Sequence, residues 1–315
     1  MTAYDACPGL PGAGAFEDGV IPSRDGDLAT LEMPMWARLH LTHAVMQAVA
    51  DETGADILHV KGPAVAAELR SAPRRSTDVD VLVRPAHLAR FLVGLRAHGW
   101  SQLSSFDEGS SFAHAANWGH PLWTFVDVHR FFPGPTVPAA DVFDELWAGR
   151  HAVELAHVAC AVPSLAAQLL VLALHEARSH RTGRFEAWDL SDAARRDETW
   201  LLARRLGAEV PLAAALGRLD EYRGRRDYPL WKFWSEPESG VPGRDRLTEW
   251  AVRFHAARSL RERAFIISRM VRVNRTHLGM ELGHSPTAAE MRAEYRHRVA
   301  AGWQGVVARL RRPRA

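Results

Sequence analysis

The chain has 315 residues, of which 47% are hydrophobic and 24% are charged, and its formal net charge is +2. This balance is typical of a soluble protein with a sizeable core, and it excludes both wholesale disorder and a short peptide scaffold. Two cysteines, Cys7 and Cys160, are too few for a disulfide framework or a four-thiolate zinc site. We therefore expect a cytoplasmic protein.

The first 32 residues are rich in Gly, Pro and Asp and contain no apolar run. They predict a flexible tail and not a signal peptide. The longest apolar stretch, 158–174, is interrupted by Pro163 and falls short of the ~20 residues that span a bilayer. We interpret this stretch as a buried helix and expect no membrane partner.

Residues 33–136 alternate between helix and strand patterns, which predicts an α/β domain. Gly54 and Gly99 are expected to end helices, and Pro63 and Pro85 to begin them. Helices are predicted at 34–49, 64–69 and 85–98, and strands at 57–60, 78–83, 100–104, 111–115 and 122–129.

Residues 137–315 show helical periodicity with no clear strand alternation. Helices are predicted at 139–147, 164–179, 188–194, 199–206, 211–219 and 244–273, with a loop at 236–243. The predicted fold class is α+β, with an α/β domain that has a mixed sheet and is followed by a helical domain.

Charge is distributed unevenly along the chain. From residue 251 onward there are 14 Arg and 4 Glu, a net charge of +10, which leaves −8 for the preceding residues. The basic end is either a solvated helix face or a surface that attracts an anionic substrate, a nucleotide or RNA. Only Lys61 and Lys232 among the 39 basic residues are lysines. Each lysine is present either by chance or because its position needs chemistry that the planar guanidinium of an arginine cannot supply.

Acidic residues on two predicted strands form the main candidate site. Asp78 and Asp80 are two residues apart, so both side chains emerge on one face of their strand. Asp127 has similar apolar flanks and would join them if the two strands are neighbours. Three crowded carboxylates repel one another unless cations neutralise them, and such oxygen ligands suit Mg²⁺ that also holds phosphates. The alternative is a pair of solvated aspartates at the polar end of a strand.

Three segments in this order carry a resemblance to a known family: Val60-Lys61-Gly62, the stretch 74–83 around Asp78-Val79-Asp80, and Val126-Asp127-Val128-His129. They resemble the nucleotidyltransferase superfamily of the DNA polymerase β type. More narrowly, they are similar to the bacterial branch described as uncharacterised nucleotidyltransferases, in which Lys-Gly stands where the superfamily usually has Gly-Ser. The resemblance covers roughly residues 36–220 and makes 33–136 the nucleotidyltransferase-like domain.

The resemblance implies a role for each matching residue. Asp78, Asp80 and Asp127 would bind two Mg²⁺ ions, or Mn²⁺ in their place, with Asp127 acting as a ligand or as the base for the acceptor. Gly62 would cradle a triphosphate. Lys61 would contact phosphate because Pro63 has no amide hydrogen and the turn has no serine hydroxyl. Two arginines just before the strand would approach the same charge unless they form surface salt bridges: Arg74 and Arg75.

Other residues have weaker claims to a role. His129 either touches substrate or is a structural histidine. For three remaining groups, helix packing or capping is a simpler interpretation than the functional alternative. These alternatives are zinc ligation by His175 with His180, a weak metal site at Asp189 with Asp192, and base stacking by Trp231, Phe233 and Trp234 beside Lys232.

The function implied by the resemblance is Mg²⁺-dependent transfer of a nucleoside monophosphate from an NTP to an acceptor hydroxyl or phosphate, with release of pyrophosphate. The acceptor is left open between a sugar, a small molecule, a modified peptide and RNA. The Lys61-Gly62-Pro63 turn favours an alternative: a catalytically inactive binding or regulatory protein. A phosphohydrolase that uses the same carboxylates is a third reading.

Overall fold

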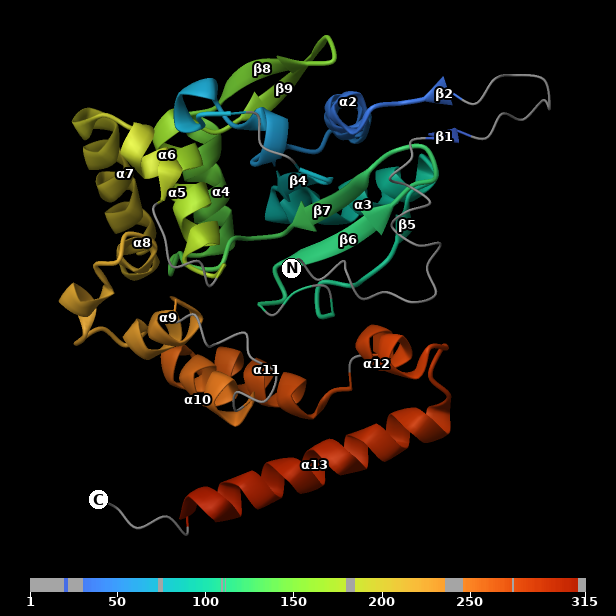
Figure 1. The fold of residues 1–315 in the computed structure, drawn as a ribbon, viewed down its shortest axis with the longest axis vertical. Helices are drawn as coiled ribbons and strands as arrows, with labels where there is room; N and C mark the ends of the chain where they lie inside the picture. The colour runs from blue at the N-terminus through green and yellow to red at the C-terminus, as the bar shows by residue number, and fades with distance from the viewer. Residues whose placement is uncertain are drawn as a thin grey trace.

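The computed structural model describes residues 20–21, 31–72, 76–108, 110, 112–179, 185–235, 246–273 and 275–310. The fold is α+β, as the sequence predicts: a five-stranded mixed sheet lies beside a body of helices (Figure 1). No helix within the described ranges is both long and apolar enough to cross a bilayer.

The sheet has the strand order β3-β4-β7-β6-β5. The central pair, β4 and β7, is parallel, and every other neighbouring pair is antiparallel. The strands are β3 (Ile57–His59), β4 (Asp78–Val83), β5 (Ser101–Gln102), β6 (Ala115–Gly119) and β7 (Phe125–His129).

Two helices, α2 (Met35–Thr53) and α3 (Leu88–Ala97), cover one face of the sheet. Alternate residues of β4 and β7, such as Val79 and Val126, are fully buried against them. Period-two alternation therefore puts valines on the helix side and the aspartates on the opposite side. The predicted stop of the first helix is confirmed, because Gly54 takes a left-handed conformation with φ 63°.

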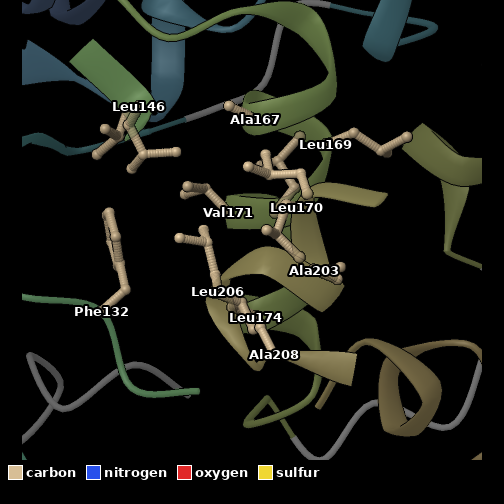
Figure 2. Close-up of a cluster of buried hydrophobic side chains, with 14 of the residues drawn as sticks. Phe132, Leu146, Ala167, Leu169, Leu170, Val171, Leu174, Ala203, Leu206 and Ala208 are labelled. Atoms are coloured by element: carbon tan, nitrogen blue, oxygen red, sulfur yellow. The ribbon is translucent and has the colours of Figure 1, made fainter. Parts of the chain in front are cut away.

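The helical half of the protein, α4 to α13, follows the sheet in the chain, and its first helices pack on the opposite side of the sheet. Leu58 and Leu82 from the sheet share one apolar core with helices α4, α5, α7 and α8. Figure 2 shows Leu146, Leu170 and Leu174 gathered in this core with Phe132. The helices that build it are α4 (Ala139–Ala148), α5 (Leu165–Glu176), α6 (Glu186–Leu190), α7 (Ala193–Leu206) and α8 (Glu209–Ala215).

Two groups of elements lie at the ends of the described chain, and short 3₁₀ turns connect some of the longer elements. β1 and β2 pair with each other, and the C-terminal helices follow α8 (Figure 1). Their bounds are β1 (Val20–Ile21), β2 (Leu31–Glu32), α9 (Tyr228–Ser235), α10 (Arg246–Ala256), α11 (Leu260–Val271), α12 (Arg275–Leu282) and α13 (Ala288–Leu310). The 3₁₀ turns are η1 (Gly62–Ala64), η2 (Ala67–Leu69), η3 (Pro85–His87) and η4 (Leu219–Tyr222).

Some of the C-terminal arginines contact the loop between β5 and β6. Arg269 donates to the carbonyl oxygen of Asp107 at 2.6 Å, and Arg272 lies 3.1 Å from its carboxylate. Helix packing is confirmed for Trp231, which is 2% exposed and stacks on Phe112 with 6.3 Å between ring centroids.

The interpretation of 158–174 as one buried helix is wrong. Its first part is strand β9 (Val158–Val162), which pairs with β8 (His151–Leu155), and only its second part belongs to α5. The hairpin turn places Ala156 and His157 at φ 49° and 64°. Turns of this kind usually carry Gly or Asn, so neither residue signals a hairpin in the sequence.

The predicted helix over 64–69 is also wrong. The segment forms the short turns η1 and η2, with extended backbone at Val65 between them. The backbone N–H of Ala66 donates to the Gln168 side chain of α5 at 2.9 Å, so a tertiary contact replaces a helical bond. The strand predicted at 111–115 begins later, at Ala115. The predicted loop at 236–243 and most of the predicted tail lie outside the described residues.

Candidate active site

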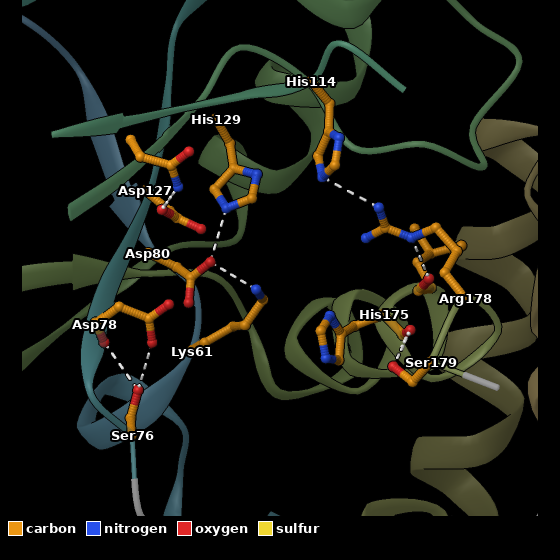
Figure 3. Close-up of polar contacts among 12 residues, drawn as sticks. Lys61, Ser76, Asp78, Asp80, His114, Asp127, His129, His175, Arg178 and Ser179 are labelled. Carbon is orange, nitrogen blue, oxygen red and sulfur yellow. Dashed lines mark hydrogen bonds and ion pairs between the residues drawn. The ribbon is translucent and has the colours of Figure 1, made fainter. Parts of the chain in front are cut away.

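The three aspartates of the predicted site come from the two parallel strands at the centre of the sheet. The register pairs Asp80 directly with Asp127, and Asp78 precedes Asp80 by two residues on the same face. The side chain of Asp80 is 3% exposed. Figure 3 shows Asp78, Asp80 and Asp127 in a column along this face.

Asp80 is the centre of a polar cluster in Figure 3. Its Oδ1 atom lies 2.5 Å from the Lys61 ammonium and 2.7 Å from Nε2 of His129. Burial by itself raises the pKa of this carboxyl, but the Lys61 charge and the hydrogen bond from His129 together hold the pKa well below its usual range. Asp80 is therefore ionised, with His129 as a hydrogen-bond donor.

Asp127 is in the opposite electrostatic situation. Burial, followed by the charges of Asp80 and Asp78, raises the pKa of Asp127 to about 8. Burial and the Asp80 charge also raise the pKa of Asp78. Asn117 of β6 donates its amide hydrogen to Asp127, which fixes the carboxyl without neutralising it. Without a cation, Asp127 therefore keeps its proton at neutral pH, because the face does not support a further negative charge beside Asp80.

One group of potential metal ligands is found within the described ranges. Asp80, Asp127 and His129 each offer one atom, and these atoms all lie within 4.8 Å of one another. Asp78 is outside this tight group, with Ser76 donating to its carboxylate at 3.0 Å. The sequence-based set of Asp78, Asp80 and Asp127 had not included His129, although its position two residues after Asp127 places it on the same face.

The Lys61-Gly62 turn leads from β3 to the acidic face. Gly62 is buried and has φ 58°, a conformation that side chains disfavour. A Cβ at Gly62 would lie 3.6 Å from Oγ of Ser76 and 3.9 Å from Nε2 of His43. Ser76 thus brings a hydroxyl to the turn from outside it, where the turn itself has none. The sequence gives no signal for this, because only the fold brings the two segments together.

Behind the turn lies a buried hydrogen-bond chain that links α2 to β3. Nδ1 of His43 is 2.8 Å from Nδ1 of His59, and Nε2 of His59 is 3.3 Å from Oε1 of Gln47. The Gln47 amide nitrogen donates to Asp51, so Oε1 must accept from His59. His59 therefore accepts from His43 through Nδ1. This leaves Nε2 of His43 as a buried lone pair without a hydrogen-bond partner among the described residues.

The other predicted site residues lie away from the three aspartates or outside the described residues. Arg74 and Arg75 lie outside the described residues, as does His180. Asp192 is the N-cap of α7 and accepts from the backbone N–H of Arg195 at 2.7 Å, which confirms the capping interpretation. A separate pocket of about 610 Å³ includes Glu68, His151 and Arg195 in its lining but none of the three aspartates.

The family of the chain follows from its sequence. A family model described as uncharacterised nucleotidyltransferase matches residues 39–223, and the chain belongs to this family. The sheet with its acidic face and the adjoining helices is a nucleotidyltransferase-type α+β fold. A search among curated proteins gives no match.

Three solved structures are similar to part of the chain. A solution structure of the antibiotic-resistance factor ANT(2″)-Ia is 14% identical and covers 60% of this chain and 91% of its own, with a TM-score of 0.35. A crystal structure of ANT(2″)-Ia in complex with adenylyl-2″-tobramycin is also 14% identical and covers 59% and 98%, with a TM-score of 0.35. An antigenic nucleotidyltransferase-like protein from Paracoccidioides brasiliensis is 17% identical and covers 59% and 89%, with a TM-score of 0.33.

Proposed function

We propose that the protein is a Mg²⁺-dependent nucleotidyltransferase that moves a nucleoside monophosphate from an NTP to an acceptor hydroxyl or phosphate and releases pyrophosphate. The observation that carries the proposal is the register that pairs Asp80 with Asp127 on adjacent parallel strands, with Asp78 on the same face. Membership of the nucleotidyltransferase family supports the same reaction class.

The donor set fits a divalent cation. The carboxylates of Asp78, Asp80 and Asp127 are hard oxygen ligands, and the raised pKa of Asp127, at about 8, reflects burial and negative charge that a cation would relieve. We assign these three aspartates as the metal ligands. His129 can join them only when the hydrogen that its Nε2 donates to Asp80 has left. When bound, Mg²⁺ or Mn²⁺ would neutralise charge on the phosphate oxygens of the substrate.

The remaining residues of the site would bind and orient the nucleotide. Lys61 supplies a positive charge next to Asp80, and Gly62 permits phosphate to approach the backbone of the turn. In the transfer, an oxygen of the acceptor bonds to the α-phosphorus as the bond from this phosphorus to its bridging oxygen breaks. Pyrophosphate leaves with that electron pair, and the acceptor proton passes to Asp127 or to solvent.

One observation favours a second function, that of a nucleotide-binding protein without transfer activity. The ammonium of Lys61 and the imidazole of His129 both contact Oδ1 of Asp80. These two donors satisfy the carboxylate in the absence of a metal. In this alternative, Lys61 permanently occupies the position next to Asp80, and a nucleotide binds without metal.

The deciding experiment measures pyrophosphate release from each NTP, with Mg²⁺ or Mn²⁺ and a panel of sugars, small hydroxylated molecules, peptides and RNA. The wild type is compared with Asp80→Asn and with a control, Asp141→Asn, at an exposed position of α4. We expect metal-dependent release that falls by about 100-fold or more in Asp80→Asn and is unchanged in the control. Equal rates in wild type and Asp80→Asn would refute the transferase. Nucleotide binding that is independent of metal, without turnover, would support the second function.

A further inference from the structure

A guanidinium from the helical half faces the candidate active site. Arg178 lies two residues after the end of α5, and its Nε donates to the carbonyl oxygen of Leu174 at 3.0 Å. Its NH1 lies 3.1 Å from Nε2 of His114. Because a guanidinium can only donate, Nε2 of His114 is the acceptor. This nitrogen therefore carries no hydrogen, and the imidazole is neutral. Both groups that hold Arg178 in place are therefore uncharged.

The positive charge of Arg178 is not paired with a carboxylate in the part of the chain that the structure describes. Among the described residues, no acidic side chain forms a salt bridge with it. Asp80 acts on it through space, but the Oδ1 atom of Asp80 is already bound by Lys61 and His129. Burial lowers the pKa of Arg178 to about 10, a value at which the guanidinium is still charged at neutral pH. A partly buried cation with only neutral partners is costly, and an anionic ligand would compensate it.

The position of Arg178 indicates which anion this is. In Figure 3 its guanidinium points toward the side of the site where the Lys61 ammonium lies, with His175 of α5 beneath. The acidic face repels an anion. Phosphate groups that approach this face therefore need cations on the side that points away from the aspartates. Lys61 supplies one such cation from the sheet domain. Arg178 supplies another from the helical half, with the planar donor fork that suits phosphate oxygens.

We infer that Arg178 is a substrate-binding residue that contacts the terminal phosphates of the NTP, the part that leaves as pyrophosphate. This inference rests on the proposed function and adds to it a residue from outside the sheet domain. It also gives the helical half a direct role, since the triphosphate would be held between Lys61 on one side and Arg178 on the other. The sequence alone gave no reason to select this arginine among 37.

The test is calorimetric titration of the full-length protein with three probes: a non-hydrolysable α,β-methylene ATP, inorganic pyrophosphate and AMP, each with Mg²⁺. The variants are Arg178→Gln and Arg178→Lys. The matched control is Arg196→Gln, because Arg196 is also partly buried and also donates to backbone carbonyls, those of Trp188 and Asp189. Far-ultraviolet circular dichroism and thermal unfolding establish that each variant is folded.

We expect Arg178→Gln to weaken binding of the triphosphate analogue and of pyrophosphate by about 10- to 100-fold, the range for a charged hydrogen bond. Binding of AMP should be unchanged, and Arg178→Lys should lose less than Arg178→Gln. The Arg196→Gln control should bind all three probes as the wild type does.

Folded Arg178→Gln that binds pyrophosphate and the analogue with wild-type affinity overturns the inference. If that variant does not fold, the neutral variant Arg178→Met takes its place in the same comparison, because Arg178→Lys keeps the positive charge, and wild-type affinity for both probes then overturns the inference. Wild-type turnover with an unchanged KM for NTP in Arg178→Gln also overturns it, while the transferase stands. Binding that depends on Arg178 in a protein without turnover supports the inference and removes the transferase. A wild type that binds none of the probes removes both.

Discussion

The buried histidine pair behind the Lys61-Gly62 turn should make the fold sensitive to acid. His43 and His59 are each 0% exposed. Burial lowers the pKa of His43 to about 3, and burial together with His43 lowers the pKa of His59 well below its usual value. In the unfolded chain both residues bind a proton near pH 6.5, whereas in the folded protein neither does.

The direction of the pH dependence of stability follows from the protonation of the folded and unfolded states. Between about pH 6.5 and pH 3 the unfolded chain holds more protons than the folded protein, so the free energy of unfolding falls as the pH falls. Each buried neutral histidine contributes a slope of about 1.4 kcal/mol per pH unit. We therefore expect His43→Gln, whose amide can still donate to His59, to remove one of these two contributions. Between pH 6 and pH 4 the variant should lose about 2.7 kcal/mol less than the wild type.

The measurement is urea unfolding at pH 4, 5, 6 and 7 in the presence of a chelator, with the m-value checked at each pH. His157→Gln is the control, because that side chain is 96% exposed and should leave the slope unchanged. Parallel pH profiles for His43→Gln and the wild type would show that His43 does not stay neutral in the folded protein. In that case Nε2 of His43 would carry a hydrogen and would not be a lone pair, while Nδ1 would still donate to His59.

Four further changes should have measurable effects. Gly62→Ala puts a side chain at φ 58° and should cost about 1 kcal/mol in thermal unfolding while weakening the binding of a triphosphate analogue in calorimetry. Leu170→Ala, at a position that is 1% exposed, should lower the free energy of unfolding in urea by about 2–5 kcal/mol, and a loss below 1 kcal/mol would contradict the core described above. Lys61→Met leaves the buried carboxylate of Asp80 without its ammonium and should cost about 3 kcal/mol in chelator. Added Mn²⁺ should restore more stability to this variant than to the wild type, and equal restoration would argue against a cation at Asp80. Because burial raises the pKa of Asp127 to about 8, the folded wild type binds the extra proton and loses stability as the pH rises from 5 to 8. Asp127→Asn should reduce that loss by up to about 4 kcal/mol in metal-free urea unfolding, and an unchanged pH profile would contradict the raised pKa.

Local features of the site could be deduced from the sequence because they depend on short-range geometry. The two-residue spacing of Asp78 and Asp80 places both on one face of any strand, whatever packs around it. Gly54 ends α2 in a left-handed conformation that glycine adopts at little cost. The hairpin turn at Ala156 and His157 was missed because these residues lack that preference, although they adopt the same conformation.

The sequence by itself determined which side chains share a face, where helices end and that the chain belongs with the nucleotidyltransferases. Only the tertiary structure decided that β4 and β7 are parallel neighbours, which puts Asp127 opposite Asp80. It also decided that Ser76 lies over Gly62 and that Arg178, just after α5, faces the acidic cluster (Figure 3). Strand order, register and contacts between distant segments depend on how whole elements pack, and the periodicity of a single segment contains no information about its neighbours.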